Sequence, residues 1–299
     1  MNKKQFSGLW TALITPFKEG NGIDNEIDYE ALDKLLQLQI DGKVDGVLLL
    51  GTTAENPTLS KEEQMQIVQF AIPKLKGKTK IMVNVGTYST ANSIENIKNF
   101  DKLDGIDGYL IVNPYYNKPT QTGLYLHFTT CANITSNPII LYNIKGRTGV
   151  NLETETLLKI IGESPNVVGI KEASGNIEQM KEVINKTPDY FSVLSGDDGM
   201  TYDLIQNGGD GVISVASNLI PGKMKEFIDA CLEKSPIAKE LNQKYSEFFN
   251  KIFIQTNPLP AKTYLAFKGI IKETFRFPMC EMDLKEKTEF LEFIQKNNF

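Results

Sequence analysis

A single lysine stands near the end of an apolar run, VVGIKE, at residues 167–172. A strand buried on both faces reads as such a run, and a charged amine within it is costly unless it is paired or neutral. Lys171 is therefore open to three interpretations: an ion-paired residue lining a barrel, a phosphate ligand, or an amine nucleophile that forms a Schiff base. The third requires burial that lowers the lysine pKa from about 10.4. Strand alternation predicts that the next side chain, Glu172, points to the opposite face.

Hydroxyl groups and one arginine follow other apolar runs of the chain. Phenols linked through a threonine hydroxyl can relay protons to and from a carbinolamine oxygen without adding charge. Arg147 offers a planar fork for a carboxylate. Together these groups suggest a lysine-dependent aldolase acting on a carboxylated keto compound, although ordinary packing at a barrel mouth remains an alternative for each tyrosine. The candidates besides Lys171 are Thr15, Thr52, Thr53, Glu55, Tyr115, Tyr116, Tyr142, Asn143, Arg147, Glu172, Ser195, Asp197, Asp198, Ile213 and Ser214.

Eight short apolar runs rich in β-formers must position these groups. Amphipathic stretches separate them, such as residues 25–43 and residues 60–77, and the second opens with a Ser/Glu capping pattern. This alternation predicts an α/β fold, a (β/α)₈ TIM barrel, whose active site lies at the C-terminal ends of the strands. A doubly wound open sheet is the alternative, but the first run is followed by TPFKEGNGIDN, which lacks the Gly-rich fingerprint. The runs are LWTALITPF, GVLLLGT, KIMVNVG, GYLIVNP, PIILYN, VVGIKE, FSVLSG and GVISVA.

The sequence beyond the eighth run is helical in period and longer than one closing helix requires. We therefore expect a barrel over residues 1–224 and a C-terminal helical region, residues 225–299, packed on it. The glycines of NGGDGVIS, just before the eighth run, could cradle a phosphate. Because Asp210 would lie close to such an anion, a turn is the better interpretation.

Composition excludes several classes of protein. The net charge is −5, and basic residues are interleaved with acidic ones, which disfavours nucleic acid and anionic membranes as partners. Binding of small anionic substrates remains compatible with this composition. The scattered cysteines, Cys131, Cys231 and Cys280, have no metal-ligand spacing and suit a reducing compartment. His127 is the single histidine and falls in a helical pattern, so we expect it to be structural and a Ser/His/Asp mechanism to be absent. We predict a soluble, cytoplasmic protein without metal or cofactor.

Seven motifs along the chain resemble the bacterial 4-hydroxy-tetrahydrodipicolinate synthase (dihydrodipicolinate synthase) family, within the superfamily of N-acetylneuraminate lyase and other Schiff-base aldolases. They cover essentially the whole chain, in order and at matching spacing. The resemblance implies a lyase that condenses pyruvate with aspartate 4-semialdehyde on the way to diaminopimelate and lysine. The motifs are GTTAENPTLS (51–60), VNPYYNKPTQTGLYLHF (112–128), YNIKGRTGVNL (142–152), GIKEASGN (169–176), LSGDD (194–198), GVISVASN (211–218) and TNPLPAK (256–262).

The resemblance also implies a role for each matching residue. Lys171 forms the Schiff base, and Tyr142 transfers protons through Thr53 to Tyr116, which reaches in from a neighbouring subunit of a dimer of dimers. The remaining roles concern substrate binding: Thr52 and Thr53 hold the pyruvate carboxylate, Ile213 lines the pyruvate site through its carbonyl, and Arg147 receives the carboxylate of the aldehyde.

Related enzymes of the superfamily cleave sugar acids instead. They share the lysine and the tyrosine, whereas Arg147 and the paired threonines of GTT resemble the synthases. Two departures from the family pattern stand out. Ala54 replaces a glycine, which would strain the turn if that position has positive φ. Lys145 replaces a proline and either adds positive charge near the aldehyde or is simply solvated.

Inhibition by lysine is a separate matter, because sensitive family members hold the inhibitor in an interface cavity with histidine and glutamate side chains. Tyr115 is retained here, but no acid stands at Asn92, and Lys61 would repel the ammonium group. We predict weak or absent inhibition; half-maximal inhibition below about millimolar lysine would contradict this. The matching positions are Asn56, Pro57, Lys61, Gln64, Tyr88, Asn92 and Tyr115.

Two further hypotheses stay open. The chain could be a related pyruvate-dependent lyase, which cleavage assays on N-acetylneuraminate or keto-deoxy sugar acids would reveal. It could also bind a keto acid without turnover, as a sensor or structural subunit.

Overall fold

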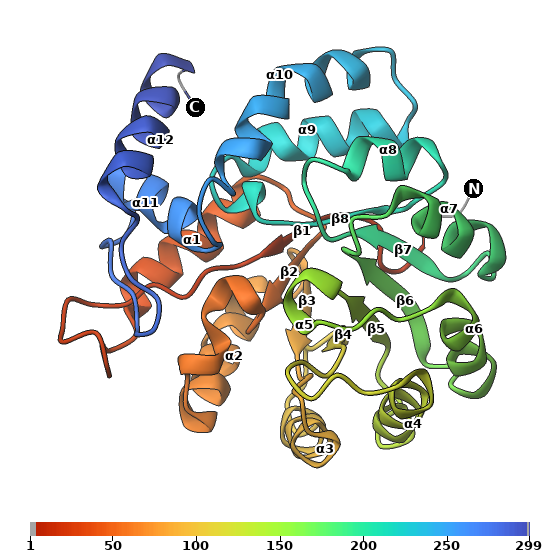
Figure 1. Cartoon of the computed structure of the whole chain (residues 1–299). Helices are drawn as coiled ribbons and strands as arrows, with labels where there is room; N and C mark the ends of the chain where they lie inside the picture. The colour runs from red at the N-terminus through yellow and green to blue at the C-terminus, as the bar shows by residue number, and fades with distance from the viewer. Residues whose placement is uncertain (1–3, 298) are drawn as a thin grey trace.

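Eight parallel strands form a closed barrel at the centre of the molecule (Figure 1). The computed structural model describes residues 4–297 and 299. Each strand pairs with the next, and β1 also pairs with β8, which closes the sheet. The (β/α)₈ barrel predicted from the alternation of runs is confirmed. The strands are β1 (Gly8–Ala12), β2 (Gly46–Leu49), β3 (Lys80–Asn84), β4 (Gly108–Val112), β5 (Ile139–Asn143), β6 (Val167–Glu172), β7 (Ser192–Ser195) and β8 (Gly211–Ser214).

Helices follow the strands and cover the outside of the barrel (Figure 1). The predicted capping pattern at Ser60 is present: its side chain accepts from the backbone N–H of Glu63, whose carboxylate accepts from the backbone N–H of Ser60. The helices up to the last strand are α1 (Tyr29–Asp41), α2 (Lys61–Leu75), α3 (Thr90–Phe100), α4 (Gln121–Ala132), α5 (Lys145–Thr148), α6 (Thr154–Glu163), α7 (Ile177–Lys186) and α8 (Thr201–Gln206).

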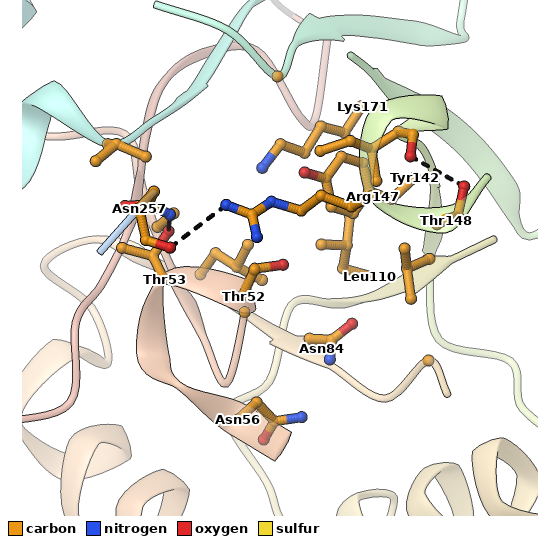
Figure 2. A pocket seen from close by; sticks show the side chains of 18 of the residues that line it. Thr52, Thr53, Asn56, Asn84, Leu110, Tyr142, Arg147, Thr148, Lys171 and Asn257 are labelled. Carbon is orange, nitrogen blue, oxygen red and sulfur yellow. Dashed lines mark hydrogen bonds between the residues drawn. The ribbon is translucent and has the colours of Figure 1, made fainter. Parts of the chain in front are cut away.

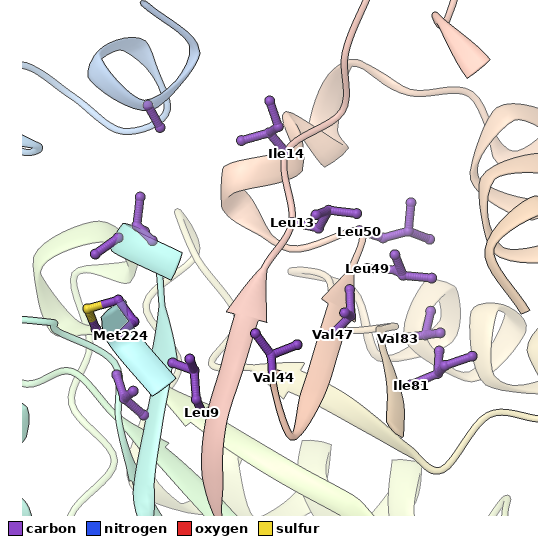
Figure 3. Packing of buried hydrophobic residues seen from close by; sticks show 14 of the residues in the cluster. Leu9, Leu13, Ile14, Val44, Val47, Leu49, Leu50, Ile81, Val83 and Met224 are labelled. Atoms are coloured by element: carbon purple, nitrogen blue, oxygen red, sulfur yellow. The ribbon is translucent and has the colours of Figure 1, made fainter. Parts of the chain in front are cut away.

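The period-two alternation of strand side chains divides the buried residues into two clusters. Outward side chains such as Val47, Leu49 and Val83 belong to the large cluster between strands and helices (Figure 3). Their neighbours Leu48 and Met82 belong to a smaller cluster that fills the barrel interior. Strand residues that alternate with outward ones therefore face the barrel axis, where the chemistry must lie.

Helical structure continues after β8, as expected. The segment contains the 3₁₀ turn η3 (Ala216–Asn218) and helices α9 (Pro221–Leu232), α10 (Ile237–Lys251), α11 (Leu259–Phe267) and α12 (Leu284–Asn297). Because α9 packs against β1 and β8 and runs across the expected boundary at residue 224, we propose that the barrel ends with α9 and the extension begins after it.

The glycine-rich segment before β8, residues 207–210, forms a turn between α8 and β8. The Asp210 carboxylate accepts a hydrogen bond from the backbone N–H of Val193 at 2.8 Å and from the Lys4 amine at 3.0 Å. These partners satisfy the carboxylate within the fold and support the turn interpretation. Among the described residues, no helix is both long and apolar enough to cross a membrane.

His127 is buried on α4, the helical position expected for it. Its Nδ1 atom lies 2.9 Å from the Thr90 hydroxyl, and burial lowers its pKa to about 4. The imidazole is therefore neutral at pH 7. Cys131 and Cys231 are buried free thiols whose pKa burial raises to about 12, so neither is a ready nucleophile.

Candidate active site

A cavity of about 250 Å³ opens at the C-terminal ends of the strands (Figure 2). It is lined by residues of strands β1 to β6, by residues that follow the strands, including Gly196 after β7 and Val215 after β8, and by the segment between α10 and α11. This placement agrees with the site position expected for the barrel. The predicted site residues that line it are Thr52, Thr53, Asn56, Tyr115, Tyr142, Arg147 and Lys171, joined by Asn84, Gly196, Val215, Phe253 and Asn257.

Lys171 projects from β6 into this cavity and is 94% buried, with only 6% of its surface exposed. Burial lowers its pKa to about 7; nearby Asp198 opposes this change and Arg147 adds to it. Its amine lies 4.3 Å from the centroid of the Tyr142 ring. A large fraction of the amine is thus neutral at pH 7, which is the state that a nucleophile requires.

Gly196, just after β7, gives the Lys171 side chain its room. A Cβ atom at Gly196 would lie 3.0 Å from Cε of Lys171 and 2.6 Å from Cβ of Ala173. The contact with Ala173 is closer than real Cβ atoms make, and the contact with Lys171 would require that side chain to shift, so the glycine after β7 leaves space for the lysine.

Glu172 points away from Lys171, as strand alternation predicts. Its carboxylate accepts from the backbone N–H of Ser174 at 2.7 Å, from Asn143 at 3.2 Å and from Gln179 at 3.4 Å. Burial raises its pKa against the effect of these hydrogen bonds. This polar cluster braces the outer side of β5 and β6, directly behind the two reactive side chains.

Tyr142 is the partner of Lys171 in the β5–β6 register, so the phenol and the amine arise from adjacent strands. The tyrosine is buried, and burial raises its pKa, with Arg147 opposing and Asp197 reinforcing the change. The phenol therefore keeps its proton at neutral pH. It can donate that proton in a hydrogen bond and accept another proton in exchange.

The two threonines lie on η1 (Thr52–Ala54), a 3₁₀ turn directly after β2. Thr53 is buried, while Thr52 is exposed at the cavity wall. The Asn257 amide donates a 2.9 Å hydrogen bond to the Thr53 hydroxyl oxygen. That bond occupies one lone pair and leaves the Thr53 proton and its second lone pair for other partners, as a proton relay requires.

Asn257 is a site residue that the sequence reasoning did not single out, although it stands in the recognised segment TNPLPAK. It lies between α10 and α11, far along the chain from the strands, and a lone asparagine carries no periodic signal. Its backbone carbonyl also accepts a 3.4 Å hydrogen bond from the Arg147 guanidinium (Figure 2). Asn257 thus contacts both Thr53 of η1 and Arg147.

Arg147 lies on α5 at the exposed rim of the cavity. Figure 2 shows the Arg147 and Lys171 side chains extending toward Thr53 and Asn257. A substrate carboxylate could enter between the guanidinium and the threonine hydroxyls. Lys145, at the start of α5, is exposed.

Asp198 is a buried carboxylate close to Lys171 whose role the sequence left unassigned. Its Oδ2 atom accepts backbone hydrogen bonds from Val215 and Ala216, both at 3.0 Å. Burial raises its pKa to about 6 despite these donors and a hydrogen bond from Ser214. At pH 7 its negative charge favours the protonated lysine and limits the fall in the lysine pKa.

Two residues to which the resemblance assigns a role in the reaction, Tyr116 and Ile213, lie outside the cavity of the single chain. Tyr116 has positive φ and a side chain that is 93% exposed, as expected for a residue that acts in a neighbouring subunit. Ile213 belongs to the cluster that fills the barrel interior, and Val215, just after β8, lines the cavity. The roles of Tyr116 and of the Ile213 carbonyl stay predictions.

The positions compared with the lysine-inhibition site are divided between the cavity and two helices: Asn56, Pro57 and Tyr115 line the cavity, Lys61 and Gln64 lie on α2, and Asn92 lies on α3. Tyr88 and Tyr115 make an edge-to-face contact at 5.4 Å. Lys61 forms an ion pair with Glu95, so part of its expected repulsion is neutralised. Asn92 is exposed on α3. Weak or absent lysine inhibition stays a prediction.

The replacement of glycine by Ala54 causes no backbone strain. Ala54 lies within η1, and the positive φ of this turn, 53°, occurs at the next residue, Glu55. The sequence could not place the left-handed residue, because only the conformation of the turn decides which position carries it.

Known proteins share this fold and this sequence over nearly its full length. Residues 5–297 match the model of the dihydrodipicolinate synthetase family. The 4-hydroxy-tetrahydrodipicolinate synthase of Endomicrobium trichonymphae is 42% identical over 280 residues, which cover 93% of this chain and 94% of the relative. That of Aquifex aeolicus is 40% identical over 294 residues, with 98% of each chain covered.

The chain belongs to the dihydrodipicolinate synthetase family. The crystal structure of the Aquifex aeolicus dihydrodipicolinate synthase superposes with a TM-score of 0.94, at 98% coverage of each chain. A monomeric dihydrodipicolinate synthase variant, 37% identical, superposes with a TM-score of 0.92, covering 98% of this chain and 97% of the other. Membership in this family makes the protein a lyase and excludes a merely structural subunit.

Proposed function

We propose that this protein condenses pyruvate with L-aspartate 4-semialdehyde through a Schiff base on Lys171. The product is 4-hydroxy-tetrahydrodipicolinate, and the reaction is the committed step of diaminopimelate and lysine biosynthesis. The observation that carries the proposal is the buried Lys171 amine, which faces the cavity with a pKa of about 7. Such an amine is a nucleophile at physiological pH.

The first half of the reaction joins pyruvate to the lysine. The neutral Lys171 amine attacks the keto carbon of pyruvate, and the nitrogen loses a proton while the former carbonyl oxygen gains one. The carbinolamine then takes up a further proton on that oxygen and expels water, leaving a protonated imine. Tyr142 supplies and recovers these protons, with the Thr53 hydroxyl as its link to solvent or to a second phenol.

The second half forms the new carbon–carbon bond. Loss of a proton from the pyruvate methyl group converts the imine into an enamine, whose terminal carbon attacks the aldehyde carbon of the semialdehyde. The aldehyde oxygen takes up a proton. The amino group of the semialdehyde then attacks the imine carbon and displaces Lys171, which closes the ring and restores the free enzyme.

Separate groups hold the two substrate carboxylates. Thr52 and Thr53 offer hydroxyl and backbone N–H donors for the pyruvate carboxylate at the inner end of the cavity. Arg147 offers a guanidinium fork for the carboxylate of the semialdehyde at the rim. Since sugar-acid lyases need polar groups for hydroxyls instead, the arginine at the rim favours the synthase reaction over their cleavage reactions.

Direct assays separate the two reactions. Purified protein is given pyruvate with aspartate 4-semialdehyde, and in parallel N-acetylneuraminate or a keto-deoxy sugar acid, while pyruvate consumption or release is followed. We expect condensation only, lost in Lys171→Ala and kept in the control Lys181→Ala, whose lysine is on the surface of α7. Cleavage of a sugar acid without condensation would overturn the proposal.

We also propose that the working protein is a homotetramer, a dimer of dimers in which Tyr116 completes the site of its neighbour. The support is the exposed position of Tyr116 together with the family relay that needs its phenol. Its location in the cytoplasm is a further proposal, supported by three free cysteines, which suit a reducing compartment.

A further inference from the structure

A group of buried charged side chains adjoins η1, the turn that carries Thr52 and Thr53, and does not line the cavity. Lys262 of α11 and Glu55, the residue that ends η1, form an ion pair in which both side chains are fully buried. The Lys262 amine also donates to the backbone carbonyl of Thr274 at 2.8 Å. It lies 4.3 Å from the ring centroid of Phe17 and 4.9 Å from that of Phe275. The charge is therefore enclosed by one carboxylate, one carbonyl and two aromatic faces.

Arg276 extends this group toward α2. Its backbone N–H donates to the second oxygen of Glu55 at 3.2 Å, so both oxygens of that carboxylate are occupied. Its guanidinium makes a forked ion pair with Glu63 and donates to the carbonyl of Asn25. The Glu55 carboxylate is thus fixed by two separate parts of the C-terminal region.

Glu55 connects this group of charges directly to η1, the turn that carries Thr52 and Thr53. It stands two residues after Thr53, and its backbone N–H donates to the carbonyl of Thr52 at 3.1 Å. It also adopts the left-handed conformation, φ 53° and ψ 34°, which is unfavourable for glutamate and persists only where the surroundings impose it. The ion pair with Lys262 holds the Glu55 side chain, which is not among the residues that line the cavity.

A buried ion pair is a poor device for stability alone, since well-packed apolar residues of similar volume do as well or better. Here the pair holds a strained turn that carries a hydroxyl of the proton relay. We propose that Glu55 and Lys262 are positioning residues for catalysis, which lock the Thr52–Ala54 turn so that Thr53 meets Tyr142 and the pyruvate carboxylate. This inference rests on the proposed function, because it assumes the role given there to Thr53.

The decisive test removes both charges together. In the double variant Glu55→Gln/Lys262→Met no unpaired charge remains buried, so we expect a thermal midpoint near that of the unmodified protein. We expect kcat to fall about tenfold to a hundredfold, because a misplacement of about 1 Å in the site has this effect. A double variant that keeps both its thermal midpoint and its kcat would show that the pair does not position the turn, and would overturn the inference.

A second variant covers the case in which the double variant does not fold. Glu55→Asp keeps the charge but shortens the side chain by one methylene group. The carboxylate can then reach Lys262 only if the backbone of the turn shifts. We expect a folded protein with kcat lowered at least about fivefold and with an unchanged KM for the semialdehyde, whose carboxylate is held by Arg147. A kcat equal to that of the unmodified protein would overturn the inference by itself.

Two controls distinguish this inference from the proposed function. Lys287→Met removes a partly exposed lysine of α12 that pairs with Glu273 at 2.8 Å, and we expect it to keep its kcat. Borohydride trapping of pyruvate on the unmodified protein tests the Schiff base itself. If the unmodified protein traps no pyruvate, the proposed function fails. If it traps pyruvate and the variants turn over normally, only the positioning role fails.

Discussion

At the scale of single residues, the molecule sets one amine apart from its other lysines. Most of the other lysines that the structure describes lie on the surface, whereas Lys171 is enclosed by the barrel, and only the charge of nearby Asp198 opposes the fall in its pKa. The fully buried Lys262 has a direct carboxylate partner instead. Burial without close pairing is the condition that turns a lysine into a nucleophile at neutral pH.

The rate of Schiff-base formation should therefore follow the titration of Lys171. Its pKa of about 7 predicts that kcat/KM for pyruvate rises nearly tenfold per pH unit below pH 7 and levels off above it. Measurement of kcat/KM for pyruvate from pH 5.5 to pH 9.5 checks this. A rate that continues to climb beyond pH 9 would show an ordinary, solvated lysine.

The same burial has a cost for stability. The unfolded chain holds the lysine proton up to pH 10.5, whereas the folded chain releases it near pH 7, so the cost is complete below pH 7 and disappears as the pH approaches 10.5. At about 1.4 kcal/mol per tenfold change in proton affinity, this cost is on the order of 4 kcal/mol at pH 7 and about half of that at pH 9.

Replacing Lys171 with methionine should remove this cost. We expect Lys171→Met to be inactive yet to have a higher free energy of unfolding, by up to about 4 kcal/mol at pH 7 and by about half of that at pH 9. Urea unfolding at both pH values measures the difference. A variant less stable than the unmodified protein at pH 7 would contradict the buried, uncompensated amine.

At the scale of elements, the turn after β2 is the point where barrel and C-terminal region meet. Asn257 fixes the Thr53 hydroxyl and Lys262 fixes Glu55, so two residues that follow α10 control a turn that follows β2. The helical extension therefore contributes to the site as well as to the fold.

The turn itself offers a test of its conformation. Because Ala54 has ordinary helical φ, a return to the family glycine should only increase the freedom of the unfolded chain and remove one buried methyl group. We expect Ala54→Gly to lower the free energy of unfolding by about 1 kcal/mol and to leave kcat within about twofold. A stabilised variant would indicate a positive φ at this position.

The features that could be predicted from the sequence are those marked by a periodic pattern of apolar and polar residues. Alternation along VVGIKE was sufficient to place Lys171 inside and Glu172 outside, and the repeated strand and helix patterns were sufficient for the barrel. Asn257, Lys262 and the left-handed Glu55 have no such signal, because each acts through a contact between segments about 200 residues apart. Only the closed structure brings those segments together.

At the scale of the whole molecule, one predicted relay residue points away from its own site. Tyr116 is almost fully exposed, while Tyr142, Thr53 and Lys171 converge on the cavity. An assembly in which Tyr116 enters the neighbouring cavity would complete each site only between subunits.

Mixed oligomers test this arrangement. We expect Tyr116→Phe and Lys171→Ala each to be nearly inactive alone, and their co-refolded mixture to regain about a quarter of the original activity, since random pairing restores one site in half of the dimers. A mixture no more active than its components would place the Tyr116 phenol outside the relay.

The central claim is that Lys171 itself carries the substrate. The most direct measurement is to incubate the protein with pyruvate, reduce with borohydride, and locate the added mass by peptide mass spectrometry, with Lys171→Ala in parallel. We predict one pyruvate-derived adduct per chain, on the peptide that contains Lys171, and none in the variant. An adduct on another lysine, or no adduct on a folded protein, would contradict the account.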